Sequence, residues 1–316
     1  MHERRVIADY FYFSHNQSVT VGIGDDAAVV RPPTNAQLAV STDTLVENVH
    51  FFSDAAPFFL ARKAAAVSLS DMAAMGARPL WMTVALTATK GADWLAAFAN
   101  GLRNSAAEFD YAIIGGDLSR GERVSVTTTA IGTVEGTPIV RGGATIGDDV
   151  WLSGATGEAA LAVRWRQKIL PIPENTDYAT VLARLDNPTP RVALGFSLRG
   201  IASAAMDLSD GLMLAAEDVA ATSGVSIVLE FPRLPVAAAL HCLSESARNE
   251  LMLAGGDDYE LLFCAPTTKH AQVLAASNGT AYCIGQVVAG EGVIVRDVNG
   301  QEINLSQKGY EHDFCD

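Results

Sequence analysis

The sequence has few charged residues, few lysines, and none of several common catalytic motifs. Charged residues make up 18% of the 316 positions and hydrophobic residues 49%, a composition typical of a globular protein with a sizeable core. Lysine occurs only at positions 63, 90, 168, 269 and 308, and none of them follows a glycine-rich loop in the Walker A pattern. The absence of H-E-x-x-H and of G-x-S-x-G argues against a zinc peptidase and a Ser-His-Asp hydrolase.

Cysteine is also scarce, and long apolar runs are missing. Cys242, Cys264, Cys283 and Cys315 include no C-x-x-C pair, which disfavours a metal cluster and suits a reducing compartment. No apolar run approaches the roughly 18 residues of a membrane helix, and the N-terminal residues lack the apolar core of a signal peptide. We therefore expect a cytoplasmic protein with no membrane association. The net charge of -14 argues against nucleic acid as a partner, but not against phosphorylated small molecules balanced by cations.

Runs of strand length and helix length alternate along the chain, which predicts an α/β (α+β) protein of two domains. In the first part the predicted strands are 38–42, 80–89, 111–115 and 123–134, and the predicted helices are 57–76 and 92–109. The Gly- and Thr-rich segment 135–149 predicts a domain junction, with domains at 1–138 and 139–316. The second part predicts strands at 150–153, 225–230 and 259–264, two terminal strands, and helices at 157–168, 191–204, 211–223 and 268–278, with another ending near 254.

Aspartates gather beside glycines and at the ends of apolar runs. They lie in GIGDDAAV (22–29), STDTLVENVHF (41–51), SLSDMAAMGARP (68–79), IIGGDLSRG (113–121), MDLSDGL (206–212) and AGGDDYELL (254–262). Asp and Gly also form ordinary turns and helix caps, which explains Asp148 and Asp149. Asp71 fits that explanation poorly, because a carboxylate inside an apolar, Ala-rich helix loses hydration unless a cation or donors meet it. Ligands bind at strand ends in α/β sheets, and Mg²⁺ prefers oxygen ligands, so we expect these aspartates to converge on a magnesium site.

Together these stretches resemble the thiamine-monophosphate kinase family of the aminoimidazole ribonucleotide synthetase superfamily. IGQV (284–287) and KGYEH (308–312) complete the resemblance, and all the stretches occur in family order from residue 22 to residue 312. The resemblance implies phosphoryl transfer from ATP to thiamine monophosphate with several Mg²⁺ ions. It also implies a homodimer in which the N-terminal domain, which binds ATP and metal, pairs with its copy to form a β-barrel, beside a C-terminal α/β domain.

The resemblance also implies roles for individual residues. The implied metal ligands are Asp26, Ser41, Thr42, Asp43, Asp71, Asp117, Asp207 and Asp210. The implied ATP contacts are Gly116, Asp117, Arg141 and Ser209, and the implied substrate contacts are His50, Asp257 and Tyr310. No general base is implied. The family usually has Glu at the position of Asp257 and Gly at the position of Ala162, and the shorter Asp257 side chain predicts a weaker or water-mediated substrate contact.

Other functions fit some of the same residues. Selenophosphate synthetase carries a reactive Cys or selenocysteine near its N-terminus, whereas no cysteine precedes Cys242 here. The pair STDTLVENVHF and AGGDDYELL points away from aminoimidazole ribonucleotide synthetase itself. A two-metal phosphohydrolase would release phosphate from ATP without thiamine monophosphate, and a non-catalytic nucleotide-binding subunit would bind ATP without turnover.

Overall fold

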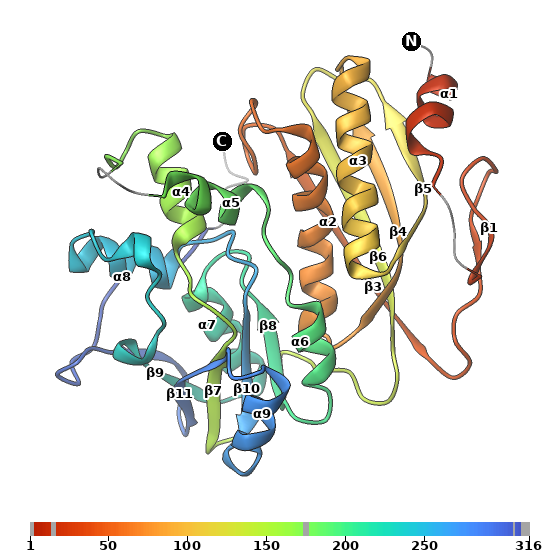
Figure 1. Ribbon diagram of the computed structural model, residues 1–316. Helices are drawn as coiled ribbons and strands as arrows, with labels where there is room; N and C mark the ends of the chain where they lie inside the picture. The colour runs from red at the N-terminus through yellow and green to blue at the C-terminus, as the bar shows by residue number, and fades with distance from the viewer. Residues whose placement is uncertain (1–2, 14–16, 173–176, 306, 311–316) are drawn as a thin grey trace. The chain divides into compact units, whose positions relative to one another are not determined.

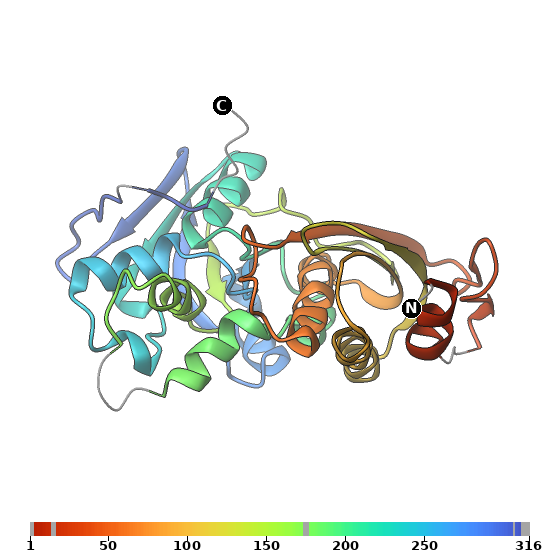
Figure 2. The same ribbon diagram turned by 90° about the horizontal axis from the view of Figure 1, so that it is seen from above.

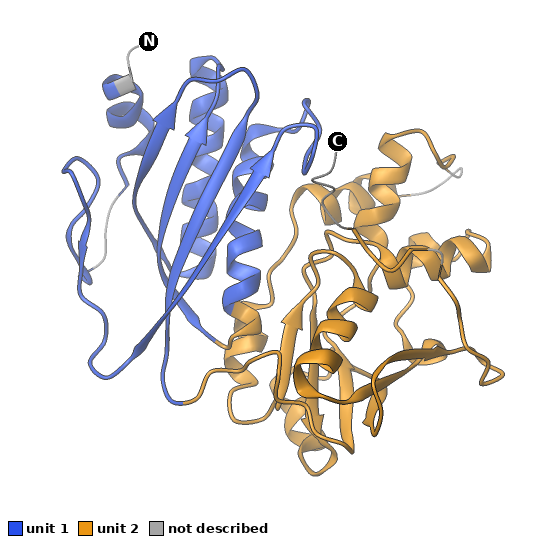
Figure 3. Cartoon of the chain, turned by 180° about the vertical axis from the view of Figure 1, so that it is seen from behind, with its two compact units in different colours: residues 1–72, 77–136 blue, residues 73–76, 137–316 orange. Residues whose placement is uncertain are grey.

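The chain divides into two compact units in the computed structural model, which describes residues 3–13, 17–172, 177–305 and 307–310 (Figure 3). Unit 1 comprises residues 1–72 and 77–136, and unit 2 comprises residues 73–76 and 137–316. Residues 311 and 312 of the final matching stretch, and Cys315, lie outside the described residues. None of the helices in the described ranges has the length and apolar character needed to cross a membrane.

Unit 1 is built on a four-stranded sheet. The sheet contains β3 (Gln37–Val46), β4 (Arg78–Thr87), β5 (Ala112–Ser119) and β6 (Ser125–Val134) in the order β3-β6-β4-β5. Strands β4 and β5 are parallel, and the other pairs are antiparallel. With α2 (Pro57–Ala74) and α3 (Ala92–Phe109), this confirms the predicted β-α-β-α-β-β order. The chain before β3 forms α1 (Glu3–Val6), the π-helix η1 (Ile7–Phe11) and the pair β1 (Val19–Val21) and β2 (Val29–Val30).

Helices α2 and α3 cover one face of this sheet (Figures 1 and 2). Every residue from Leu60 to Ser70 of α2 is buried, which explains why most of these positions hold alanine or another apolar residue. Gly101 of α3 allows close packing, because a Cβ there would lie 2.2 Å from the carbonyl oxygen of Phe58. No described helix of unit 1 covers the opposite face, and the described sheet does not close into a barrel within one chain (Figure 3).

Two strands of unit 1 are longer than the sequence predicts. Strand β3 continues through Asp43 to Val46, and β5 continues through Asp117 to Ser119, so both aspartates lie inside strands and not after them. The reason is cross-strand pairing, which a local pattern does not reveal. Asp43 pairs with Thr128 of β6, and flanking threonine hydroxyls face each other across the two strands.

Unit 2 is built on a six-stranded mixed sheet. Its strands are β7 (Asp148–Leu152), β8 (Ala204–Asp207), β9 (Ser226–Glu230), β10 (Leu261–Pro266), β11 (Tyr282–Val288) and β12 (Gly292–Arg296), in the order β12-β9-β11-β7-β10-β8. Its helices are α4 (Glu158–Arg166), α5 (Tyr178–Asp186), α6 (Val192–Ser197), α7 (Leu212–Ser223), α8 (Glu245–Ala254) and α9 (His270–Ala276). Single 3₁₀ turns are η2 (Phe231–Arg233), η3 (Ala238–Leu240) and η4 (Thr267–Lys269). Only the β9–β12 pair is parallel among these strands.

Strand β10 lies inside the core of unit 2, since side chains on both of its faces are buried. Leu261, Phe263 and Ala265 join a cluster with residues of β7, α6 and α9, while Leu262 and Cys264 are equally buried on the other face. The helix predicted over 191–204 is wrong at its C-terminal end. Helix α6 stops at Ser197, and the alanines at 204 and 205 pair with β10 as strand β8.

Candidate active site

Asp43 and Asp71 form a carboxylate pair in unit 1. Asp43 projects from β3 toward α2, which carries Asp71, and the Ser41 hydroxyl donates a hydrogen bond to Asp71. Burial, and then the negative charge of Asp71, raises the pKa of Asp43 from 3.8 to about 6, although the Ser68 hydroxyl lowers it. Among the described residues, the buried Oδ2 atom of Asp43 has no hydrogen-bond partner. The fold therefore holds two carboxylates close together. Their ionisation costs folding free energy, and a bound cation would offset that cost.

The oxygens around this pair suit Mg²⁺. Carboxylates and hydroxyls are the hard ligands this ion takes, and it usually binds through one or two carboxylates while keeping waters or substrate phosphates. No three His, Cys, Asp or Glu side chains in the described ranges lie close enough to hold a metal ion together. The hydroxyl of Thr42, a predicted ligand, lies on the opposite face of β3 from Asp43 and contacts Thr129 at 2.9 Å. The structure thus brings together Ser41, Asp43 and Asp71, without the Thr42 side chain.

Asp26, Gly116 and Asp117 line a cavity of about 440 Å³ in unit 1. The loop at 22–28 and the strand segment at 113–118 form its polar side, and apolar residues that include Phe11 and Leu102 form the rest. Gly116 has no substitute there, because a Cβ would lie 1.8 Å from the carbonyl oxygen of Val84 on the paired strand. The size and the mixture of apolar walls with a few polar groups are typical of a small-molecule site.

Three separate stretches of unit 2 meet at the predicted residues Ser209, Asp210, Asp257 and Tyr310. The backbone N–H of Asp257 donates to the carbonyl oxygen of Ser209 at 2.8 Å, and that of Tyr310 donates to Asp210 at 3.1 Å. Glycines next to Asp257 and Tyr310 permit the close approach of these backbones to Ser209 and Asp210. A Cβ on Gly256 would lie 2.6 Å from the Ser209 carbonyl oxygen, and one on Gly309 would lie 2.5 Å from that of Asp210.

Asp207 and Ser209 are positioned by the end of β8. Asp207 is the last residue of that strand, and it is 5% exposed. The Ser209 hydroxyl donates to Asp210 at 2.7 Å in the turn that leads to α7. The aspartates predicted in this part of the chain therefore flank one short strand-to-helix connection.

The remaining two predicted residues have defined surroundings of their own. In unit 1, the backbone N–H of Val46 donates to Nδ1 of His50 at 3.0 Å, which leaves Nε2 to carry the proton of the neutral ring. His50 stands in the turn that follows β3, and its carbonyl oxygen accepts from Lys63 at 3.3 Å. In unit 2, the exposed Arg141 forms a 3.3 Å ion pair with Asp218 of α7.

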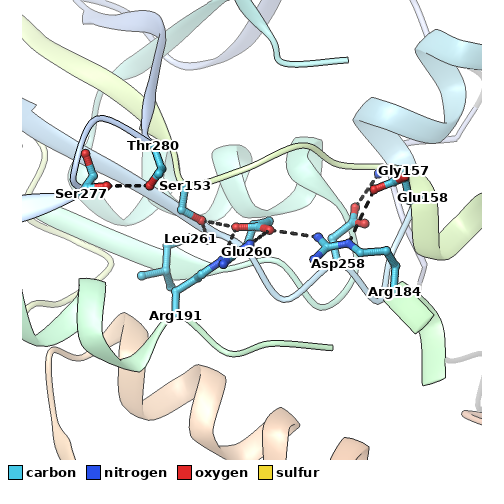
Figure 4. Close-up of polar contacts among 10 residues, drawn as sticks. All are labelled: Ser153, Gly157, Glu158, Arg184, Arg191, Asp258, Glu260, Leu261, Ser277 and Thr280. Carbon is cyan, nitrogen blue, oxygen red and sulfur yellow. Dashed lines mark hydrogen bonds and ion pairs between the residues drawn. The ribbon is translucent and has the colours of Figure 1, made fainter. Parts of the chain in front are cut away.

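Buried charges that no sequence motif indicates follow Asp257. Asp258 is 2% exposed and Glu260 is 1% exposed, and Arg184 and Arg191 bind Glu260 (Figure 4). Burial raises the pKa of Asp258 to about 8. Despite a similar burial, the hydrogen bonds and charge of Arg191 hold the pKa of Glu260 below its usual value. Acidic residues at the alternate positions 258 and 260, just before the apolar run at 261–265, were the available sign that these two groups are buried.

Comparison with known proteins identifies the family. Residues 24–134 match the AIR synthase related protein N-terminal domain, and residues 146–298 match the corresponding C-terminal domain. The chain is 39% identical to the thiamine-monophosphate kinase of Salmonella typhimurium over 98% of each sequence. The crystal structure of thiamine-monophosphate kinase from Stenotrophomonas maltophilia is 39% identical, with a TM-score of 0.84 over 95% of this chain and 96% of that one.

A solved structure of AaThiL complexed with AMPPCP and TMP is also similar. It is 29% identical, with a TM-score of 0.79 over 92% of each chain. The matches extend through both compact units and through each aspartate-containing stretch described above. The chain therefore belongs to the thiamine-monophosphate kinase family of the AIR synthase related proteins.

Proposed function

We propose that this protein uses ATP and Mg²⁺ to phosphorylate thiamine monophosphate, giving thiamine diphosphate and ADP. The observation that carries the proposal is the Asp43–Asp71 pair, a costly arrangement of acidic oxygens inside a fold shared with kinases of that name. The structure of AaThiL with AMPPCP, an ATP analogue, and TMP supports the choice of both substrates.

Asp43 and Asp71, with Ser41, are the residues of unit 1 that fit the metal best. We assign Asp26 and Asp117, and Asp207 and Asp210 of unit 2, to the same task on the family resemblance. When bound, Mg²⁺ supplies positive charge against the phosphates and holds the reacting oxygens in line. That charge matters because two unit charges 4 Å apart repel by roughly 4 kcal/mol at an effective dielectric of 20.

The acceptor needs no protein base. A phosphate monoester has a second pKa of about 6, so thiamine monophosphate is largely a dianion at neutral pH and is ready to attack. The chain's own residues therefore have to bind, orient and exclude water, and no side chain has to remove a proton. We accordingly propose direct in-line transfer without a phosphorylated enzyme intermediate.

The two substrates contact different residues in this proposal. We assign Gly116 and Asp117, which line the unit 1 cavity, to ATP. On the family resemblance alone, we also assign Arg141 and Ser209 to ATP. Thiamine monophosphate contacts a second set, His50, Asp257 and Tyr310. The proton on Nε2 of His50 makes that nitrogen a donor, and the exposed Tyr310 ring offers a flat apolar face. Asp257 reaches less far than the glutamate usual in the family.

We also propose that unit 1 forms the homodimer interface. Residues 38, 40, 42 and 44 of β3 are exposed on the sheet face that no described helix of unit 1 covers, and Leu38 and Val40 are 55% and 62% exposed. Pairing of this face with a second copy would bury that apolar surface. The free thiols of Cys242, Cys264 and Cys283 suit the cytoplasmic location that the proposal includes.

A coupled ADP-release assay tests the function. The protein is supplied with ATP and MgCl₂, with and without thiamine monophosphate, and thiamine diphosphate is followed by chromatography. We expect product only when both substrates and Mg²⁺ are present, and no product after EDTA treatment. ADP release that ignores thiamine monophosphate would instead indicate a phosphohydrolase or another acceptor, and ATP binding without any turnover would indicate a binding protein.

A further inference from the structure

The segment that carries Asp257 has an unusual backbone. Asp257 and Tyr259 have φ angles of +67° and +52°, in the left-handed region that side chains other than glycine rarely adopt. Two such residues within three positions persist only when the surroundings fix them. The Tyr259 hydroxyl also donates to Asp257 at 3.2 Å, so the strained backbone determines where this carboxylate is held.

Asp258 and Glu260, which alternate with Asp257 and Tyr259 along the segment, hold it in place. Glu260 accepts a fork of two hydrogen bonds from Arg191, one of them 2.7 Å from Nε, and a third bond of 2.9 Å from Arg184 (Figure 4). The Ser153 hydroxyl of the β7 end donates to the same carboxylate. Asp258 accepts the backbone N–H of Gly157 at 2.8 Å, where helix α4 begins.

The arginines connect this carboxylate to other elements of unit 2. Arg184 comes from α5, and its Nε lies 3.7 Å from the Glu158 carboxylate at the start of α4. Arg191 precedes α6. One buried side chain, Glu260, is therefore tied to β7, α5 and the start of α6. Its own backbone carbonyl accepts from Leu208 at 2.9 Å, beside the Ser209–Asp210 turn.

We propose that Glu260, held by Arg184 and Arg191, is a positioning residue that fixes the strained Asp257 loop for thiamine monophosphate. The inference rests on the proposed function, because Asp257 is assigned there to the substrate. Glu260 itself is 1% exposed and does not touch substrate. Loss of the Glu260 charge should therefore weaken the binding of thiamine monophosphate. The binding of ATP and the rate of phosphoryl transfer should change little.

The test compares Glu260→Gln with a matched control, Asp148→Asn. Asp148 is also buried in unit 2 and accepts from Thr145 N–H at 3.0 Å and Ser203 hydroxyl at 2.6 Å, at the far end of strand β10 from the loop. We expect both variants to lower the melting temperature. Only Glu260→Gln should raise the KM for thiamine monophosphate, by about tenfold, with kcat and the KM for ATP within threefold of the unaltered protein.

A KM for thiamine monophosphate within twofold of the unaltered protein in Glu260→Gln would overturn the positioning role, and so would an equal rise in Asp148→Asn. Should Glu260→Gln fail to fold, Arg191→Lys decides by the same criterion, because it keeps the positive charge and loses the two-bond fork. If the unaltered protein makes no thiamine diphosphate, the proposed function itself fails. If the unaltered protein makes thiamine diphosphate but the variants have an unchanged KM for thiamine monophosphate, only the positioning role is refuted.

Discussion

Replacement of Asp43 by asparagine should stabilise the metal-free protein while it destroys activity. The pKa of Asp43 is about 6 in the folded protein, against 3.8 without the fold, because burial and Asp71 oppose its ionisation. At about 1.4 kcal/mol per pKa unit, ionisation at pH 7.5 costs up to about 3 kcal/mol of folding free energy. Asp43 is only partly buried, so screening by solvent reduces the expected gain to about 2 kcal/mol.

The pH dependence follows from the direction of the shift. The pKa of Asp43 is higher in the folded protein than in the unfolded chain. Its contribution to the free energy of unfolding is therefore fully present below pH 3.8 and is lost as the pH rises through about 6. The advantage of Asp43→Asn should therefore be about 2 kcal/mol at pH 7.5 and roughly half of that at pH 5. Urea unfolding followed by circular dichroism, in EDTA, measures it at both pH values.

The control is Glu291→Gln, which neutralises an exposed carboxylate in the loop before β12. It should change the free energy of unfolding by less than about 0.5 kcal/mol at either pH. Added MgCl₂ should raise the melting temperature of the unaltered protein more than that of Asp43→Asn. If Asp43→Asn is no more stable than the unaltered protein at pH 7.5, or keeps normal turnover, the assignment of Asp43 to a metal site is refuted.

Three further predictions concern other residues. Asp71→Ala and Asp210→Ala should each reduce thiamine diphosphate formation below detection with unchanged circular dichroism, and near-normal rates would contradict their metal-binding role. Tyr310→Ala should raise the KM for thiamine monophosphate several-fold, and an unchanged KM would remove it from the substrate site. Asp258→Asn should become more stable than the unaltered protein by a few kcal/mol as the pH rises from 4 through about 8, because burial favours the neutral acid at this position. Urea unfolding measures this difference, and the absence of such a trend would contradict the burial argument.

Local patterns predicted most of the elements. Helix α3 runs from Ala92 to Phe109, as predicted, because Gly91 begins it and Asp110 ends it in a left-handed conformation. The β-rich, apolar run that predicts a strand over 123–134 forms β6 at Ser125–Val134. Local sequence patterns did not show which distant strands pair. Ala204 and Ala205 favour a helix by intrinsic propensity, but contact with β10 makes them part of a strand.

The site was predictable as a set of aspartates, but its local geometry was not. Asp71 was recognisable because a carboxylate in an apolar helix requires a partner, and the structure gives it Ser41 and the neighbouring Asp43. The opposite orientation of Thr42 depends on the extension of β3 beyond its predicted end. The arginine pairing of Glu260 joins residues 69 and 76 positions apart, and no sequence spacing indicates such a contact.

The contacts at Gly256 and Gly309 restrict which segments of this chain can be exchanged for those of a relative. Each glycine lies so close to the carbonyl oxygens of Ser209 or Asp210 that any side chain would displace a loop contributed by another stretch of the chain. A chimera that takes residues 206–212 from one relative and 255–262 or 309–310 from another would join backbones fitted to different neighbours. Replacement of these segments in this chain by those of a relative should therefore preserve the fold only when the three stretches are exchanged together.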